Sequence, residues 1–229
     1  ELQGVYLDEH FVDIGAATAF SELVNQTEVQ KHIPILAEAA ATVGAWQIQN
    51  RATIGGNIAN ASPAGDSLPV LLALNAELVL AGKKGMRTIP YDQMHSGYRS
   101  TALGPGELIV RVRIPLPRPG TLQFFEKVGT REAQAISKLV MATSALLSEG
   151  IFQDIRVGVG SVAATPVRLS AAENYLKGKT PSQKTADEVA EIARSEVQPI
   201  DDVRSTAEYR SYVTGRVLRR MVLKCGGSP

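Results

Sequence analysis

Hydrophobic and polar positions alternate over short runs in the first half of the chain, a pattern that predicts half-buried β-strands. Residues 76–81 (AELVLA) and 86–90 (MRTIP) are two such runs, separated by a Gly-Lys-Lys-Gly turn. ELIVRVRIP at 107–115 alternates apolar and basic residues and predicts a strand with one wet face. Shorter strands are expected at 5–7 and 12–14, where β-branched residues suit a pleated surface.

Apolar residues spaced three and four apart predict helices between these strands. One helix is expected to start at Thr18, whose hydroxyl is placed to cap it. A second begins at Pro34 and ends at Gly44. Asp66 precedes LPVLLALN where an N-cap belongs, and an alternative role for its carboxylate is to bind a ligand hydroxyl.

The second half of the chain begins after a proline-rich stretch that ends at Gly120. Strands are expected at 122–128, 136–147 and 155–162, although the middle run also suits a helix. Three helices are expected to follow, at 171–176, 185–197 and 205–223. In the last helix, apolar residues follow i, i+3, i+4 steps and four arginines fall largely elsewhere. These arginines indicate a solvated helix face or, alternatively, a subunit interface: Arg210, Arg216, Arg219 and Arg220.

Composition limits the classes of function. The 229 residues have a formal net charge of +1, which gives no electrostatic reason to expect a nucleic acid or an anionic membrane as partner. No apolar run is long enough to span a bilayer, and the first residues, ELQGVYLDEH, do not predict a secretory signal. Cys225 is the only cysteine, so we expect no internal disulfide, no cysteine-rich metal site and a reducing, cytoplasmic compartment.

Small residues fill the segment 53–66, TIGGNIANASPAGD. Glycine lacks Cβ, so Gly55 and Gly56 let a ligand approach the peptide N–H groups, which bind phosphate oxygens without a basic side chain. Thr53 and Asn57 add a hydroxyl and an amide. The segment therefore predicts a neutral cradle for a diphosphate, although neither a Rossmann nor a Walker motif is present and an ordinary surface loop would have a similar composition.

The motif ATIGGNIANASPAGDSLPVLLALNAELVL closely resembles the FAD-binding subunit, or medium chain, of the molybdenum hydroxylases, which include carbon monoxide dehydrogenase and xanthine dehydrogenase. Further segments match in the same order along nearly the whole chain: IGAATAFSEL, GYR, GELIVRVRIP, FEKVGTREAQAISK and GVGSVAATPVRLSAAENYLKG. The T-I-G-G-N segment followed by A-S-P and an aspartate, together with K-V-G-x-R-E-A-Q, makes the resemblance specific.

The resemblance implies an α+β fold in two domains. Residues 1–119 resemble the later part of a vanillyl-alcohol-oxidase-type (PCMH) FAD-binding domain. Residues 120–229 resemble the CO dehydrogenase flavoprotein C-terminal domain, a three-stranded antiparallel sheet with a helical bundle. The family's flavin domain normally starts with another glycine-rich loop, A-G-G-[TS], that forms the other wall of the diphosphate site. Because the present residues begin after such a loop, the resemblance implies a truncated polypeptide.

The resemblance also implies which residues contact FAD. Asp66 would accept a hydrogen bond from the polar linker of the cofactor, whereas the cradle residues would line the diphosphate. Lys127 would stabilise negative charge on the flavin, although a lysine at the end of an apolar run commonly extends to solvent. The full set carried over by motif is Val43, Thr53, Ile54, Gly55, Gly56, Asn57, Asp66, Ile109 and Lys127. No catalytic residue and no metal ligand is expected.

The resemblance implies an oxidoreductase subunit that passes electrons through FAD to NAD or another acceptor. Its expected partners are a two-cluster [2Fe-2S] subunit and a large molybdopterin subunit, in a heterotrimer or its dimer. Two alternatives are a stand-alone FAD reductase of the same superfold and a non-catalytic scaffold that has lost the cofactor. The KVGTREAQAISK and TPVRLSAAE segments argue against the lone reductase.

Overall fold

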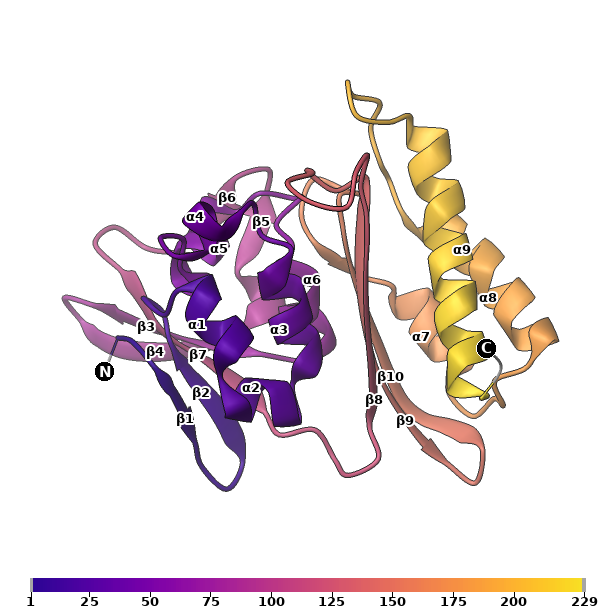
Figure 1. Ribbon diagram of the computed structural model, residues 1–229, viewed down its shortest axis with the longest axis horizontal. Helices are drawn as coiled ribbons and strands as arrows, with labels where there is room; N and C mark the ends of the chain where they lie inside the picture. The colour runs from indigo at the N-terminus through magenta and orange to yellow at the C-terminus, as the bar shows by residue number, and fades with distance from the viewer. Residues whose placement is uncertain (1, 228–229) are drawn as a thin grey trace.

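The computed structural model describes residues 2–227, which form two units packed side by side (Figure 1). Each unit is an antiparallel sheet with helices, and the helices of the first unit lie between the two sheets. The order through the molecule is therefore sheet, helices, sheet, helices. Each unit has its own cluster of buried apolar side chains, with Phe20 and Leu71 in the first and Phe152 and Leu218 in the second.

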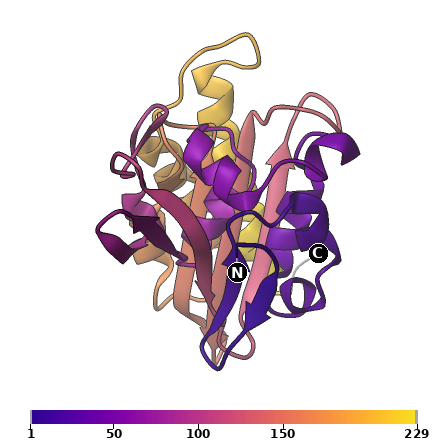
Figure 2. The same ribbon diagram turned by 90° about the vertical axis from the view of Figure 1, so that its left-hand side faces the viewer.

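The sheet of the first unit has five strands in the order β1-β2-β7-β3-β4, with every neighbouring pair antiparallel. Its strands stand at the left of Figure 1 and face the viewer in Figure 2. All five agree with the expected strands: β1 (Val5–Leu7), β2 (Phe11–Gly15), β3 (Glu77–Gly82), β4 (Gly85–Pro90) and β7 (Leu108–Pro115).

Short helices cover one face of this sheet, and the pair β5 and β6 stands apart as a small two-stranded sheet. The bounds of these elements are α1 (Phe20–Asn25), α2 (Thr27–His32), α3 (Pro34–Ala41), α4 (Trp46–Gln49), α5 (Ile54–Asn60), α6 (Leu68–Ala73), the 3₁₀ turn η1 (Tyr91–Gln93), β5 (His95–Gly97) and β6 (Ser100–Thr101).

The second unit has a sheet in the order β11-β10-β9-β8, and the segment that was compatible with strand or helix is a strand. A fourth strand of two residues, β11, extends the three-stranded sheet that the resemblance implied. The elements are β8 (Leu122–Val128), β9 (Leu139–Ser148), β10 (Ile151–Gly160), β11 (Val167–Arg168), α7 (Ser170–Leu176), α8 (Gln183–Glu196) and α9 (Ala207–Cys225). Within residues 2–227, no helix combines the length and the apolar character that a bilayer crossing requires.

Helix α6 packs directly on the second sheet, and this contact joins the two units. A Cβ added at Gly158 would lie 2.1 Å from the carbonyl oxygen of Pro69, and one at Gly160 would lie 3.1 Å from Pro69 Cγ. Glycine at these two positions of β10 therefore lets the helix backbone touch the strand backbone. Since Asp66 precedes α6 by two residues, this contact also places Asp66 beside the second sheet.

The expected cap at Thr18 is wrong. Helix α1 starts at Phe20 after Ala19, without a side-chain cap. The Thr18 hydroxyl instead accepts a hydrogen bond from Gly4 N at 2.9 Å and donates one to Gly4 O at 3.2 Å. Thr18 is fully buried, so its hydroxyl ties the N-terminal segment to the turn before the helix.

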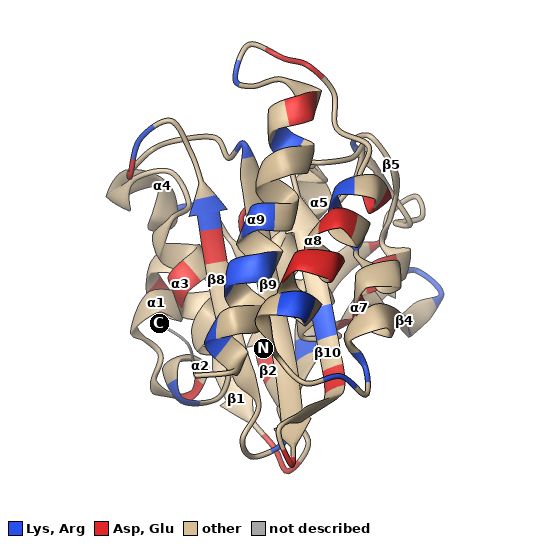
Figure 3. Cartoon of the chain, turned by 90° about the vertical axis from the view of Figure 1, so that its right-hand side faces the viewer, with Lys and Arg blue, Asp and Glu red and all other residues tan. Residues whose placement is uncertain are grey.

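The arginines of α9 do not form a uniformly solvated face. Arg210 is 3% exposed and donates to the carbonyl oxygens of Lys138 and Ser161, each at 2.9 Å, and to Asp202 at 2.8 Å. Arg219 pairs with an acidic residue of α8, and Arg220 pairs with Glu126 of β8. Figure 3 shows these opposite charges on facing elements. Arg216 and Arg220 keep the exposed positions that the helical pattern predicted, whereas Arg210 is buried and Arg219 is half-buried.

Candidate functional site

The segment that was expected to be a loop at 53–66 contains helix α5. Thr53 is its N-cap in an extended conformation, and its hydroxyl accepts a hydrogen bond from Gly56 N at 3.1 Å. The helix ends at Ala61, which has a left-handed conformation with φ of 47°. The expectation of a bare loop was wrong because the Thr53 cap acts together with the burial of Ile54 and Ile58, which packs one side of this short helix into the core.

The two glycines of α5 have different environments. A Cβ at Gly55 would lie 2.7 Å from Ala16 Cβ, so this glycine allows close packing on the chain that follows β2. Its N–H donates to Ala16 O at 2.9 Å and is not free for a ligand. Gly56 is exposed, and a Cβ there would meet only the Thr53 hydroxyl, at 3.0 Å. Gly56 is therefore the outward-facing glycine of the two, but its N–H donates to the Thr53 hydroxyl, so neither of the two peptide N–H groups that we expected to be bare is free for a ligand.

Asp66 and Lys127 form a buried ion pair between the two units. Lys127 Nζ lies 2.6 Å from Asp66 Oδ2, and both side chains are about 10% exposed. The ammonium also donates to Thr42 O at 2.8 Å. Lys127 lies near the end of β8, and Thr42 follows α3, so three distant segments meet here. The ammonium therefore does not extend to solvent, which was the common alternative.

The carboxylate of Asp66 is not a helix cap. Helix α6 has Ser67 in the N-cap position and no side-chain cap. Asp66 instead keeps a second oxygen, Oδ1, that is buried and has no hydrogen-bond partner within residues 2–227. Burial raises the pKa of Asp66 to about 6, against the opposing effect of the Lys127 charge. An acceptor of this kind requires a donor, since an unpaired buried polar atom is costly.

A hydrogen bond connects this pair to α5. Ser67, next to Asp66, donates its hydroxyl to Asn57 Oδ1 at 2.9 Å. The outward end of α5 and the buried ion pair therefore belong to one continuous region of the first unit. Val43 follows Thr42 and is 9% exposed within the core.

Ile54 and Ile109, two of the residues expected to contact FAD, are buried in or packed against the core of the first unit. Ile54 is fully buried, so only its backbone is available to a ligand. Ile109 lies on β7, half-buried against the core of the first unit, and α5 packs on that strand. Within residues 2–227, no hydrogen bond or ion pair links Ile109 to Asp66 or Lys127, and its cofactor contact stays a prediction.

The chemistry-bearing group that the sequence did not indicate is the carbonyl oxygen of Thr42. A backbone acceptor has no residue-type signature, so only the fold could identify it. Arg210 was also missed, because its helical position matched a solvated face. The buried side chain of Arg210 donates a hydrogen bond to the carbonyl oxygen of Lys138. It therefore holds in place the end of the segment 129–138, which follows β8 and Lys127 along the chain.

The fold and this site define a flavin-binding domain followed by a sheet-and-helix domain. Residues 1–117 match the FAD binding domain in molybdopterin dehydrogenase, and residues 124–225 match the CO dehydrogenase flavoprotein C-terminal domain. The chain belongs to the family of FAD-binding medium subunits of the molybdenum hydroxylases, and FAD is the cofactor of that family.

Similar proteins are subunits of oxidoreductases. The carbon monoxide dehydrogenase medium chain of Hydrogenophaga pseudoflava is 32% identical over 96% of this chain and 76% of its own length. The xanthine dehydrogenase FAD-binding subunit of Escherichia coli O157:H7 is 31% identical over 99% of this chain and 80% of its own. Among solved structures, reconstituted CO dehydrogenase from Oligotropha carboxidovorans superposes with a TM-score of 0.94, at 30% identity, over 100% of this chain and 79% of that one.

The residues of the site suit FAD. The unpartnered Oδ1 of Asp66 offers a buried acceptor to a cofactor hydroxyl, and Lys127 offers a fixed positive charge. Gly56 leaves the surface of α5 open to an approaching group. A polar, partly charged dinucleotide with both donors and anionic oxygens complements this combination.

Proposed function

We propose that this chain is the electron-transfer subunit of a molybdenum hydroxylase, with FAD held at Gly56, Asp66 and Lys127. The buried pair of Asp66 and Lys127, which keeps one carboxylate oxygen unpartnered, supports this proposal most strongly. FAD exchanges electrons singly or in pairs, so when bound it can link iron–sulfur clusters on a partner subunit to NAD or another two-electron acceptor.

The proposed partners are a two-cluster [2Fe-2S] subunit and a large molybdopterin subunit, in a heterotrimer or its dimer. The matched proteins include a carbon monoxide dehydrogenase medium chain, whose name implies further chains. No group of three or more histidine, cysteine, aspartate and glutamate side chains that could hold a metal occurs in residues 2–227.

The chain's own residues have separate roles in this proposal. Thr53 fixes the first turn of α5, and Gly56 keeps its outer surface free of a side chain. Asp66 accepts from the cofactor's linker through Oδ1, while Oδ2 holds Lys127. Lys127, whose position is fixed by two acceptors, supplies a cation that favours negative charge on a bound flavin.

Neither alternative accounts for the site as well. A lone FAD reductase does not explain the match of residues 124–225 to a CO dehydrogenase flavoprotein C-terminal domain. A scaffold without cofactor would keep a buried ion pair and an unsatisfied oxygen at a cost in stability with no benefit.

The deciding measurement is the flavin absorbance of the assembly purified from its source. Absorbance that is bleached by the hydroxylase substrate supports electron transfer, and an assembly without flavin rejects it.

Replacing Gly56 with valine is expected to weaken FAD binding at least tenfold without unfolding the chain. The new side chain projects outward and meets only the Thr53 hydroxyl, so it blocks the cofactor's approach and little else. Flavin titration of the purified apo-protein measures the change, and thermal unfolding measures the stability. Gly55→Ala is the contrasting variant, because its Cβ would collide with Ala16 and reduce stability. Unchanged flavin affinity in the Gly56 variant would reject the cradle.

FAD affinity is expected to fall as the pH drops below about 6, by up to tenfold per pH unit. The ionised carboxylate of Asp66 is the proposed acceptor, so a bound cofactor favours the charged form and protonation opposes binding. Flavin titrations from pH 5 to pH 8 measure the profile. Asp66→Asn provides the control, since its amide has no protonation step and should give weaker binding with a flatter profile. The same slope in both proteins would contradict the role of Asp66.

A further inference from the structure

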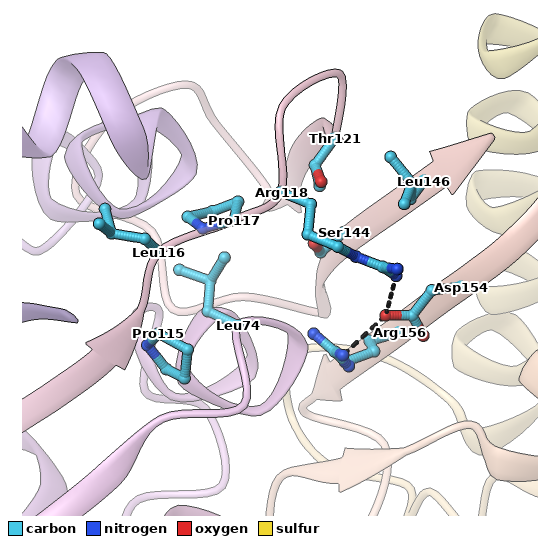
Figure 4. A pocket seen from close by; sticks show the side chains of 10 residues that line it. All are labelled: Leu74, Pro115, Leu116, Pro117, Arg118, Thr121, Ser144, Leu146, Asp154 and Arg156. Atoms are coloured by element: carbon cyan, nitrogen blue, oxygen red, sulfur yellow. Dashed lines mark hydrogen bonds and ion pairs between the residues drawn. The ribbon is translucent and has the colours of Figure 1, made fainter. Parts of the chain in front are cut away.

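A pocket opens where α6 stops covering the second sheet. Gly158 and Gly160 bring the helix against β10, but the helix ends at Ala73 and the sheet continues beyond it. Leu74 forms one wall of the resulting cavity, which has a volume of about 120 Å³ (Figure 4). A cavity needs only about 10–15 Å³ of this kind of volume to hold one water molecule, so the pocket has room for a small polyatomic group.

The sheet contributes polar side chains to this pocket on a face that is otherwise buried. Ser144 on β9 lies opposite Arg156 on β10, and Leu146 lies opposite Asp154. These four residues alternate with side chains that pack under α9, so they share the face toward the first unit. Ser144 is 6% exposed, and its side chain lines the cavity.

The segment between the two units closes the opposite side. Pro115, Leu116 and Pro117 supply apolar surface, and Arg118 and Thr121 point polar side chains at the sheet. A turn with a hydrogen bond from Thr121 N to Arg118 O at 3.0 Å holds these two residues together. The pocket is therefore built from both units and the connection between them.

The charges in the pocket do not balance. Arg156 lies 2.7 Å from Asp154 Oδ2, and Arg118 lies 3.4 Å from the same oxygen. Two guanidinium groups thus share one carboxylate, which leaves one net positive charge. Each guanidinium has five N–H donors, so most of them remain available, and the hydroxyls of Ser144 and Thr121 add further donors. Small size, excess donors and positive charge together favour a compact oxyanion.

We propose that this pocket binds inorganic phosphate or an oxyanion of the same shape, held by Arg118, Arg156 and Ser144. The bound anion would offset the net positive charge and join the connecting segment to the second sheet. The site is separate from the proposed flavin site and does not depend on it, because Lys127 and Asp66 do not line this pocket.

Thermal unfolding in phosphate tests the proposal without flavin. At a phosphate concentration ten times the dissociation constant, the midpoint is expected to rise by about 3–5 °C relative to sodium chloride of equal ionic strength. Isothermal titration with phosphate, and separately with sulfate, gives the affinities. Equal binding of both identifies a general oxyanion site, and stronger binding of phosphate identifies a site that recognises its protonated oxygen. The absence of a shift up to 50 mM phosphate, a concentration about tenfold above a millimolar-range dissociation constant, overturns the proposal.

Three variants locate the binding. Arg118→Gln, whose side chain is 62% exposed and not needed for folding, is expected to weaken phosphate binding about tenfold through the loss of one charge-assisted hydrogen bond. Ser144→Ala should weaken it as well. Arg194→Gln removes an arginine of α8 that pairs with Glu191, lies over the ring of Tyr212 and does not line the pocket, so it should leave the affinity unchanged. If Arg118→Gln and Arg194→Gln have equal effects, the anion binds elsewhere and the assignment is wrong.

Discussion

Lys127→Met is expected to lower the free energy of unfolding by about 3–5 kcal/mol at pH 8, because removing one partner leaves the other charge buried and uncompensated. Asp66 is 8% exposed and would lose the one cation that pairs with it in the part of the chain that the structure describes. The carbonyl oxygen of Thr42 would also lose its donor. Denaturant unfolding of the wild type and the variant at pH 8 measures the difference.

The pH dependence of the stability lost in Lys127→Met shows whether the unpaired charge of Asp66 causes the loss. The folded-state pKa of Asp66 is already raised by burial to about 6, and without Lys127 it rises further. For a carboxyl whose pKa is raised by folding, the favourable contribution is present below the unfolded pKa and is lost as pH rises through the folded pKa. The variant should therefore recover much of its stability at pH 5, where Asp66 binds a proton.

Lys138→Met is a matched control for this prediction. Lys138 is half-buried, and its Nζ lies 5.2 Å from the centroid of the Tyr209 ring, but it forms no salt bridge with a carboxylate in residues 2–227. Its replacement is expected to cost less than about 1 kcal/mol, with little dependence on pH. A loss for Lys127→Met that is the same at pH 5 and pH 8 would show that Asp66 is not the origin of the effect.

Gly158→Ala is expected to destabilise the chain by about 3 kcal/mol or more, because the new methyl group would occupy the position of a backbone carbonyl. The ideal Cβ lies 2.1 Å from Pro69 O, and backbone cannot rotate away as a side chain can. Helix α6 must shift, and Asp66 must shift with it. The variant should therefore lose both stability and flavin affinity, measured by chemical unfolding and flavin titration.

Gly97→Ala is the matched control for Gly158→Ala. A Cβ at Gly97 would have its nearest neighbour at 3.9 Å, an ordinary contact, so the free energy of unfolding should change by less than about 1 kcal/mol. Both positions are strand glycines, and the two variants differ mainly in what lies beside the added methyl group. Equal stabilities would mean that α6 does not pack against β10 as the structure describes.

The sequence predicted most of the secondary structure correctly. Alternation identified β3, β4 and β7, and Pro34 marked the first residue of α3. These features are local, since side-chain spacing and proline geometry do not depend on the rest of the chain. The family resemblance was confirmed as well, because a run of motifs in a fixed order depends on sequence alone.

Errors occurred where a polar side chain had more than one available partner. Thr18 and Asp66 both stand where a helix cap belongs, yet Thr18 bonds Gly4 and Asp66 bonds Lys127. Arg210 occupies a helical position typical of solvent and is buried among two carbonyl groups and Asp202. In each case a residue distant in sequence offered a better hydrogen bond than the local one.

The sequence by itself therefore determined the family, the cofactor class and most of the longer strands, because these follow from local patterns and motif order. Only the tertiary structure decided which glycine faces a ligand, where Asp66 directs its second oxygen and which cation neutralises it. Asp66 and Lys127 are 61 residues apart and belong to different units, and they meet because Gly158 allows α6 to touch β10. Burial and pairing of charge depend on such contacts, and residue type and spacing along the chain do not specify them.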